Sequence, residues 1–346
     1  MTSKGFVFLL CAFFLTVATA CTSAPATSSP VIPAPATQAP TETSAETATR
    51  TQVPSPTATA FLTSTPSLVP NFSHIIVLFF ENREFGSVIG NPAMPNYNRF
   101  ASENSLLTQY FAITHPSLPN YIAVFGGDTF KIASDCLDCF IDAPSLPDQV
   151  ESSGRTWRAY LEDLPRPCFV GDTATYDQAH NPFIYFNSIR LDKARCERSI
   201  VPLSDLQTDM AAGTLPNLVY IMPNLCDSAH DAAINPACGL SVADSWLGDM
   251  IAKLNVYLEP RASSETYLIV LTWDEGQGNH SCCGLPAEAG GRVPTVLISP
   301  LAKSGFQDAT PYTHYSLLKT IETAWNLPYL GHAADESNAL IVAPWK

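Results

Sequence analysis

The feature that most constrains the fold of this chain is a set of long apolar runs that each stop abruptly at polar residues. The runs and the residues that follow them are 74–80 before Glu81 and Asn82, 215–222 before Pro223 and Asn224, and 266–273 before Asp274 and Glu275. A continuous apolar run of this length is typical of a strand buried on both faces in a parallel sheet. The sequence therefore predicts three buried strands that each end in a polar loop.

Helical stretches lie between and after these runs. Residues 241–258 and 315–325 are predicted to be helices, and residues 293–299 are predicted to form a further strand. Strands that alternate with helices are typical of a layered α/β domain. Because ligands bind beyond the carboxyl ends of the strands in such sheets, we expect the three polar strand ends to converge on one cleft.

The first seventy residues are expected to direct export and to act as a tether. Residues 1–20 have the charged start, apolar run and small-residue end of a signal peptide, and Cys21 follows at once, as in a bacterial lipobox. Residues 21–70 are rich in Ser, Thr, Ala and Pro, a composition that predicts disorder. We therefore expect an extracytoplasmic folded domain at 71–346, anchored to the cell membrane by a lipid on Cys21. Simple secretion is the alternative.

Composition narrows the range of partners. The formal net charge at pH 7 is -14. A chain this acidic offers no basic stripe that follows a phosphate backbone, so we expect no nucleic-acid partner. A small phosphorylated substrate remains compatible with this charge, because a bound metal ion supplies positive charge locally.

Cysteine content also points to an exported protein. Beyond Cys21 the chain has the cysteines Cys136, Cys139, Cys168, Cys196, Cys226, Cys238, Cys282 and Cys283. An even number of cysteines in an exported chain favours disulfides. Cys136 and Cys139 have the spacing of half a zinc site, but no second pair has that spacing. Disulfides are therefore the favoured interpretation.

The acidic residues at two of the strand ends are candidate metal ligands. Glu81-Asn82 and Asp274-Glu275 each offer the hard oxygen atoms that divalent cations bind. A single pair of this kind more often caps a helix or lies on the surface. Two pairs that are expected in one cleft favour a metal site.

A serine near the start of a helix is the candidate nucleophile. Residues 115–121 (His-Pro-Ser-Leu-Pro-Asn-Tyr) lead into an apolar helix over 121–125, which Gly126 and Gly127 are expected to end. A helix start gathers backbone N–H groups that suit an oxyanion or a phosphoryl group, which favours catalysis by Ser117. An ordinary capping role is the alternative, and this segment alone does not separate the two.

Six motifs occur along the chain in a defined order. They are Glu81-Asn82-Arg83 with Phe85, His115-Pro-Ser-Leu-Pro-Asn-Tyr121, His180-Asn-Pro-Phe183, Pro223-Asn224 with Asp227, His230 and Asp231, Trp273-Asp-Glu-Gly276, and His314-Tyr-Ser-Leu-Leu318. In this order they resemble the bacterial phosphoesterase family of acid phosphatases and phospholipases C, a branch of the alkaline phosphatase superfamily. The resemblance covers most of 71–330. It implies an alkaline phosphatase-like α/β fold, with a mostly parallel central sheet and helices on both faces.

The resemblance also implies roles for individual residues. A divalent metal ion, whose identity stays open, is expected to be held by Glu81, Asn82, Asp274 and Glu275. Ser117 matches the nucleophile. The histidines that resemble those around the phosphoryl group are His180, His230 and His314. A single histidine in such a place is more often structural, whereas three together fit a site.

Three positions near these motifs are less well defined. Cys226 stands where relatives vary, which leaves the roles of Asp227 and His230 open. His280 either approaches the metal or orients a disulfide loop. His115 directly precedes the nucleophile turn and is a candidate to support it.

These expectations combine into a function. We expect a metal-dependent phosphoesterase, of the acid-phosphatase type acting on phosphomonoesters, that forms a phosphoserine at Ser117. A phospholipase C-type phosphodiesterase and a non-catalytic lipoprotein that binds phosphate or metal are the alternatives. The chain lacks the Gly-x-Ser-x-Gly, Walker, His-Glu-x-x-His and sulfatase signatures, which argues against those enzyme classes. Phosphorylated small molecules and phosphorylated lipids both stay open as substrates.

Overall fold

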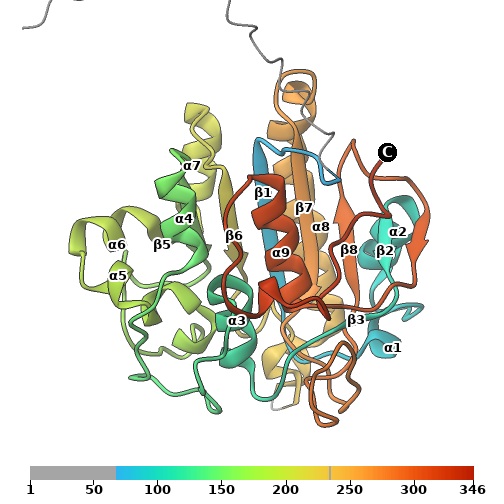
Figure 1. Ribbon diagram of the computed structural model, residues 1–346, viewed down its shortest axis with the longest axis horizontal. Coiled ribbons are helices and arrows are strands. Elements are labelled where there is room, and N and C mark those ends of the chain that lie inside the picture. The colour runs from blue at the N-terminus through green and yellow to red at the C-terminus, as the bar shows by residue number, and fades with distance from the viewer. Residues whose placement is uncertain (1–67, 234) are drawn as a thin grey trace, which may run out of the picture. The chain divides into compact units, whose positions relative to one another are not determined.

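The fold is organised around an eight-stranded sheet (Figure 1). The computed structural model describes residues 68–233 and 235–346. Within these residues the strands are β1 (His74–Phe80), β2 (Ser105–Leu107), β3 (Tyr110–Phe111), β4 (Trp157–Leu161), β5 (Ile200–Pro202), β6 (Leu218–Met222), β7 (Tyr267–Trp273), β8 (Thr295–Ile298), β9 (Phe306–Asp308) and β10 (Tyr312–Thr313). The sheet has the order β5-β4-β6-β1-β7-β8-β2-β9, and only the pairs made by β8 are antiparallel. The predicted mostly parallel α/β sheet is therefore confirmed.

The three predicted apolar runs form the middle of the sheet. They contain β6, β1 and β7, which are adjacent and buried along their whole length. In the parallel pair of β1 and β7, Phe80 lies opposite Trp273. The next residues, Glu81 and Asp274, therefore leave the sheet side by side, which brings two of the predicted strand ends into one site.

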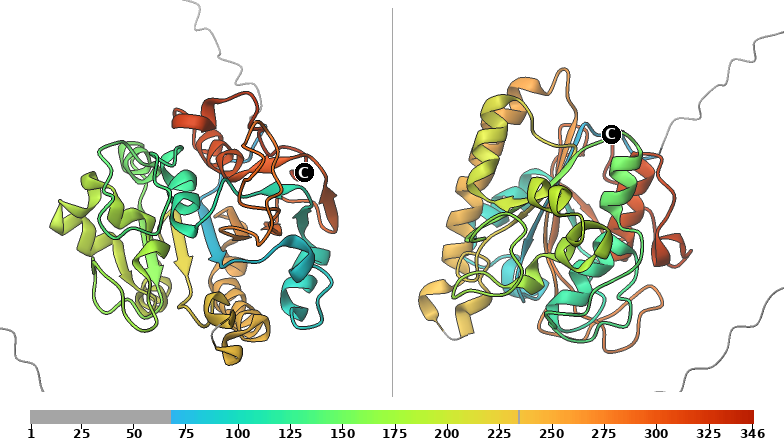
Figure 2. Two further views of the ribbon diagram at one scale, coloured as in Figure 1. Left: turned by 90° about the horizontal axis from the view of Figure 1, so that it is seen from below. Right: turned by 90° about the vertical axis from the view of Figure 1, so that its left-hand side faces the viewer.

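Helices cover both faces of the sheet (Figure 2). The α-helices are α1 (Phe85–Val88), α2 (Pro95–Glu103), α3 (Ser117–Gly126), α4 (Leu146–Ser152), α5 (Asn187–Arg190), α6 (Lys193–Ser199), α7 (Ser204–Ala212), α8 (Leu240–Leu258) and α9 (His314–Ala324). The 3-10 helices are η1 (Gln178–His180), η2 (Pro182–Tyr185), η3 (His230–Ala233), η4 (Pro236–Cys238), η5 (Glu259–Arg261) and η6 (Gly331–Ala334). One face carries α7 and α8, and the other carries α3, α4 and α9.

The predicted helices are present in the structure, and their boundaries differ from the expected ones by one residue in two cases and by four at the start of the third. The helices expected over 241–258 and 315–325 are α8 and α9, and each begins one residue earlier than expected. Helix α3 begins at Ser117, ahead of the expected start, because Pro119 is tolerated in a first turn whose amides have no intrahelical partner. As expected, it ends before Gly127, which has a left-handed backbone with φ of 76°.

All cysteines of the folded domain are paired, as the sequence predicts. The disulfides are Cys136–Cys139, Cys168–Cys196, Cys226–Cys238 and Cys282–Cys283. Cys136 and Cys139 therefore bond to each other rather than form half of a zinc site. Four disulfides fit an extracytoplasmic location.

The predicted signal peptide, Cys21 and nearly all of the predicted linker lie outside the described residues. The expectations about export and lipid attachment therefore stay predictions. Across 68–233 and 235–346, no helix has the length and apolar character needed to cross a bilayer.

Candidate active site

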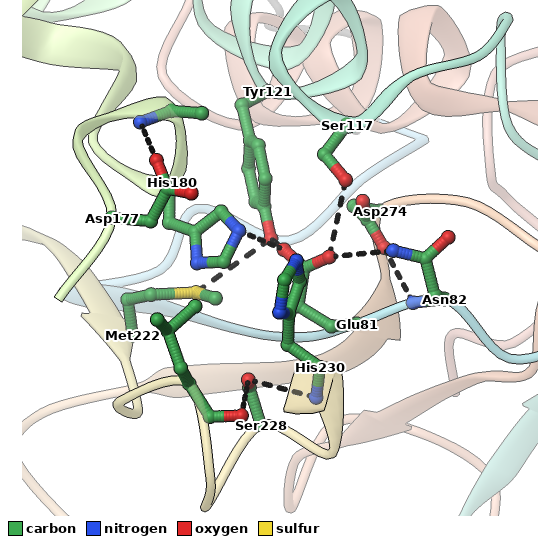
Figure 3. Close-up of polar contacts among 12 residues, drawn as sticks. Glu81, Asn82, Ser117, Tyr121, Asp177, His180, Met222, Ser228, His230 and Asp274 are labelled. Carbon is green, nitrogen blue, oxygen red and sulfur yellow. Dashed lines mark hydrogen bonds and ion pairs between the residues drawn. The ribbon is translucent and has the colours of Figure 1, made fainter. Parts of the chain in front are cut away.

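Glu81 lies at the centre of a buried polar cluster at the carboxyl end of β1 (Figure 3). Its side chain is fully buried, and it contacts Asp274 as well as several neutral or weakly basic donors. Oε2 accepts hydrogen bonds from Ser117 Oγ at 3.1 Å and from Asn82 Nδ2 at 3.1 Å. Oε1 accepts a short hydrogen bond from the Tyr121 hydroxyl and lies 3.0 Å from His180 Nε2. The cluster therefore joins the candidate nucleophile directly to a candidate metal ligand.

The turn in front of Ser117 is held by the side chain of Asn120. Asn120 Oδ1 accepts the amides of Ile113 and Thr114 at 2.8 and 3.2 Å, and its Nδ2 donates to the carbonyls of Thr114 and Pro116 at 2.9 and 3.0 Å. Ser117 and Asn120 are both buried. These four bonds explain why an asparagine follows the serine by three residues: it fixes the entry into α3 and so the direction of the Ser117 hydroxyl.

Asp274 lies next to Glu81 because their strands are neighbours in register. Its Oδ1 accepts the Asn82 amide at 3.0 Å, and Asn82 has a left-handed backbone with φ of 53°, a conformation that asparagine tolerates. Its Oδ2 is buried and has no hydrogen-bond partner among the described residues. A buried carboxylate oxygen without a partner is costly, so this atom is suited to an external ligand.

The buried acids change one another's protonation. Burial raises the pKa of Glu81 well above its ordinary value, and the charge of Asp274 raises it further. Burial also raises the pKa of Asp274, and burial together with the Asp274 charge raises the pKa of Glu275 to about 10. A divalent cation would remove this repulsion and favour the ionised acids. The oxygen donors and the free Asp274 Oδ2 therefore fit such a cation.

His180 and His230 lie on the other side of Glu81. Ligand atoms of these three residues lie within 4.8 Å of one another, and the two imidazole rings are 5.3 Å apart. Burial, followed by the charge of His230, lowers the pKa of His180 well below its ordinary value. His230 is partly exposed, and its Nδ1 lies 3.0 Å from Asp231 Oδ1. Glu81 is thus shared between the predicted oxygen-ligand set and a second set that includes two histidines.

His314 lies behind the cluster. Its Nε2 lies 2.6 Å from the backbone carbonyl of Asp274, and its Nδ1 lies 3.1 Å from the Tyr110 hydroxyl. The ring is fully buried, and burial lowers its pKa to about 4, so it is neutral. Both ring nitrogens are engaged by groups other than a ligand. This geometry gives His314 a supporting role beneath Asp274.

His115 and His280 belong to the edge of the site. His115 Nδ1 lies 2.7 Å from Glu275 Oε2, and its Nε2 lies 3.2 Å from the Gly278 carbonyl oxygen. It therefore supports Glu275, as expected from its place beside the nucleophile turn. His280 is largely exposed and pairs with Glu84 at 3.2 Å, which orients the loop after β7.

The third strand end contributes indirectly. Asn224 uses its side chain to accept the amides of Cys226 and Asp227 at 3.0 and 2.9 Å. It does not reach Glu81. Instead, its loop brings the Ser228 carbonyl oxygen within 3.1 Å of the Glu81 amide and carries His230 into the site. The expected convergence of all three strand ends thus holds for the loops, whereas the Asn224 side chain stays structural.

Two site residues were not singled out by sequence reasoning. Tyr121 donates to Glu81 and stands four residues after Ser117, so both lie on one face of α3, a spacing visible in the sequence. Arg83 donates to the backbone carbonyls of Asn82 and Ala229 at 2.7 and 3.0 Å. It links the end of β1 to the loop of His230, and only the tertiary structure reveals this contact.

Known proteins resemble the chain in sequence and in fold. A model described as the Phosphoesterase family matches residues 91–328. The chain is 30% identical over 276 residues to a phosphatidylinositol-3-phosphatase of Mycobacterium tuberculosis, covering 78% of this chain and 82% of the relative. It is 32% identical over 273 residues to a phosphate-repressible acid phosphatase of Penicillium chrysogenum, covering 75% of this chain and 60% of the relative.

A solved structure shares the architecture. A protein of the alkaline phosphatase superfamily from Vibrio parahaemolyticus superposes with a TM-score of 0.52 at 12% identity, covering 76% of this chain and 68% of that chain. The likeness shows a common fold. The family match, the two relatives and this fold confirm the resemblance seen in the six motifs. The chain therefore belongs to the phosphoesterase family and is a hydrolase of phosphoric ester bonds.

Proposed function

We propose that the protein is a metal-dependent phosphomonoesterase of the acid-phosphatase type that acts through a phosphoserine at Ser117. The observation that carries this proposal is the hydrogen bond of 3.1 Å from Ser117 Oγ to Glu81 Oε2, inside a cluster of buried acids. A hydroxyl held against a carboxylate at a helix start is positioned both to lose its proton and to attack. The acid phosphatase of Penicillium chrysogenum, a relative by sequence, supports the reaction class.

Two chemical steps follow from this arrangement. Ser117 Oγ passes its proton to Glu81 and forms a bond to phosphorus while the bond to the leaving oxygen breaks, and a second proton passes to that oxygen. We assign this proton donation to His230, which is partly exposed and paired with Asp231. Water then bonds to phosphorus as the bond to Ser117 Oγ breaks, while His230 accepts a proton from the water and Glu81 returns the serine proton to Oγ. Buried His180 orients Glu81 by its contact of 3.0 Å.

The proposed metal ligands are Glu81, Asn82, Asp274 and Glu275. Support comes from the unpartnered Oδ2 of Asp274 and from the raised pKa values of three packed acids. When bound, a divalent cation supplies positive charge that offsets the charge on phosphoryl oxygens. His180 and His230 offer the alternative ligands around Glu81.

Hydrolysis of p-nitrophenyl phosphate tests the proposal. Wild type is expected to release nitrophenol with added Mg²⁺, Mn²⁺, Zn²⁺ or Ca²⁺, and to stop when a chelator is added. Ser117→Ala is expected to lose turnover but keep its melting temperature. Ser105→Ala is the control, because Ser105 is also buried and donates one hydrogen bond, to Lys303. Full activity of Ser117→Ala would remove the serine from the mechanism, and metal binding without hydrolysis would favour a binding protein.

The substrate and the location of the protein form part of the same proposal. We place the enzyme outside the cytoplasm, lipid-anchored at Cys21 or secreted, with phosphorylated small molecules or lipids as substrates. Assays that compare monoesters with phosphatidylcholine distinguish a phosphomonoesterase from a phospholipase C-type enzyme. Labelling with a radioactive fatty acid, lost in Cys21→Ala, tests the anchor.

A further inference from the structure

A carboxylate that the proposed reaction does not use stands beside the nucleophile. Asp135 Oδ1 accepts the backbone amide of Leu118 at 2.8 Å. Leu118 directly follows Ser117 in the first turn of α3, and Pro119 has no amide hydrogen. The amide that would otherwise face an anionic ligand next to the nucleophile is therefore already bonded to a negative group.

The segment that carries Asp135 is tied down on two sides. Cys136, the next residue, is bonded to Cys139. Between them, the Leu137 carbonyl oxygen accepts a hydrogen bond of 2.8 Å from Gln178 Nε2. Gln178 begins η1, the short helix that ends at His180. The Asp135 carboxylate is thus fixed between the nucleophile helix and the helix of an active-site histidine.

The electrostatic neighbours of Asp135 locate its charge at the site. Its charge contributes to the raised pKa of Glu275, after burial and Asp274. Partial burial raises the pKa of Asp135 and the charge of Asp177 raises it further, whereas the Leu118 amide and His230 lower it. The charge of the Asp135 carboxylate therefore affects both Glu275 and His230, which lie in different parts of the site.

Few positive charges lie near Ser117 that could bind a negatively charged group of the substrate other than its phosphoryl group. Asp177 lies beside His180 (Figure 3). Arg83 is the one arginine among the residues that contact the Glu81 cluster in the described structure, and its guanidinium donates to two backbone carbonyls. Asp135 bonds to the residue after Ser117 and Asp177 caps the helix of His180, so each of these two helices begins beside a carboxylate.

We propose that Asp135 is a specificity-determining residue, which disfavours phosphate esters whose leaving group carries a negative charge. This inference rests on the proposed phosphomonoesterase function. The metal and histidines act on the phosphoryl group, whereas the charge of Asp135 acts on what is attached to it. The substrate class is therefore a phosphomonoester of a neutral or cationic alcohol.

A matched pair of substrates tests the inference. Glycerol 3-phosphate and 3-phosphoglycerate differ at one carbon, which is a neutral alcohol in the first and a carboxylate in the second. Wild type at pH 7 is expected to have the higher kcat/KM for glycerol 3-phosphate. Asp135→Asn keeps an acceptor for the Leu118 amide, and it is expected to reduce this preference about fivefold, the effect of one unit charge acting over about 4 Å through a water-like dielectric.

The control lies in the same segment. Asp138 is exposed, and its carboxylate has no hydrogen-bond or ion-pair partner among the described residues. Asp138→Asn removes the same charge and is expected to leave the substrate preference unchanged. Phosphoethanolamine, which has a cationic leaving group, is expected to lose kcat/KM in Asp135→Asn relative to glycerol 3-phosphate.

Salt provides a test that needs no variant. The preference of wild type is expected to shrink as ionic strength rises from 0.01 to 0.5 M, because a partly exposed charge is screened. An unchanged preference in folded Asp135→Asn, or one insensitive to salt, overturns the inference while activity on glycerol 3-phosphate keeps the proposed function intact. No hydrolysis of any monoester by wild type overturns both.

Discussion

Two of the regions that bury carboxylates in this protein balance the negative charge differently. Asp209 of α7 is 8% exposed, forms a short ion pair with Arg158, and accepts a hydrogen bond of 2.5 Å from the Tyr160 hydroxyl. At the carboxyl end of β1, Glu81 and Asp274 are both 0% exposed and contact neutral donors and weakly basic histidines. Asp209 is therefore balanced by Arg158, a cation of the protein itself. The acids Glu81 and Asp274 have the charge pattern of a site that a bound cation would complete.

A further closed cluster makes the contrast clearer. Buried Arg195 reaches Asp148 with Nη1 at 2.8 Å and Glu151 with Nε at 3.0 Å. The chain thus supplies arginines where it needs structural charge balance, even though acidic residues outnumber basic ones. At Glu81 and Asp274 the described residues form no arginine ion pair; the charge of Arg83 acts on both acids, but its hydrogen bonds go to backbone carbonyls.

The largest expected difference is between Asp274→Asn and Asp209→Asn. Asp274→Asn is expected to lower kcat/KM about 10²–10³-fold, the cost of losing a preorganised electrostatic group. It should nevertheless leave the melting temperature of chelator-treated protein unchanged or higher, because one buried charge is removed. Asp209→Asn is expected to keep kcat/KM and to destabilise the fold by about 1–3 kcal/mol, because the part-exposed Arg158 loses its charged partner. Equal destabilisation by both variants would refute the comparison.

A second difference is expected in the pH dependence of stability without metal. The pKa values of Glu275 and Glu322 are raised by burial, to about 10 and about 8, so the folded state keeps protons that the unfolded state has released. The free energy of unfolding of chelator-treated protein should therefore fall as pH rises from 5 to 8. Urea unfolding measures this slope. A rise in stability over this range would contradict it.

Glu322 allows the contribution outside the site to be separated. Its Oε1 accepts the Leu330 amide at 2.8 Å, and its Oε2 is buried without a partner among the described residues. Glu322→Gln is expected to flatten the slope by at most about 1.4 kcal/mol per pH unit. A saturating concentration of divalent cation should remove the part of the pH dependence of stability that comes from Glu275, because a bound cation favours the ionised acid.

The smallest expected difference is between two tyrosines that each donate to a buried carboxylate. Tyr121→Phe removes the donor to Glu81 Oε1 and is expected to lower kcat/KM about tenfold, the usual scale of a hydrogen bond to a charged group. Tyr160→Phe removes the donor to Asp209 and is expected to lower the melting temperature without changing kcat/KM. The comparison requires kcat/KM from steady-state kinetics and the melting temperature from thermal unfolding, each measured for both variants. Similar kinetic losses in both variants would show that Tyr121 acts only through stability.

Much of the fold could be anticipated from local pattern. A strand buried on both faces needs an unbroken apolar run, so β1 and β7 were visible in the sequence, and α8 and α9 were visible from their helical stretches. The start of α3 was placed too late. Pro119 looks like a helix breaker in sequence, but in the first turn it forgoes only an amide that has no intrahelical acceptor.

Some residues of the candidate site could likewise be predicted from the sequence, whereas others were revealed only by the tertiary structure. Glu81 and Asp274 follow adjacent parallel strands in register, so the amino-acid pattern was sufficient to expect them together. The role of His314 beneath Asp274, the contact of Tyr121 with Glu81 and the position of Asp135 against Leu118 depend on loops and helices meeting across the fold. Backbone periodicity specifies which residues end a strand, but only packing in three dimensions decides which side chains then come within hydrogen-bonding distance.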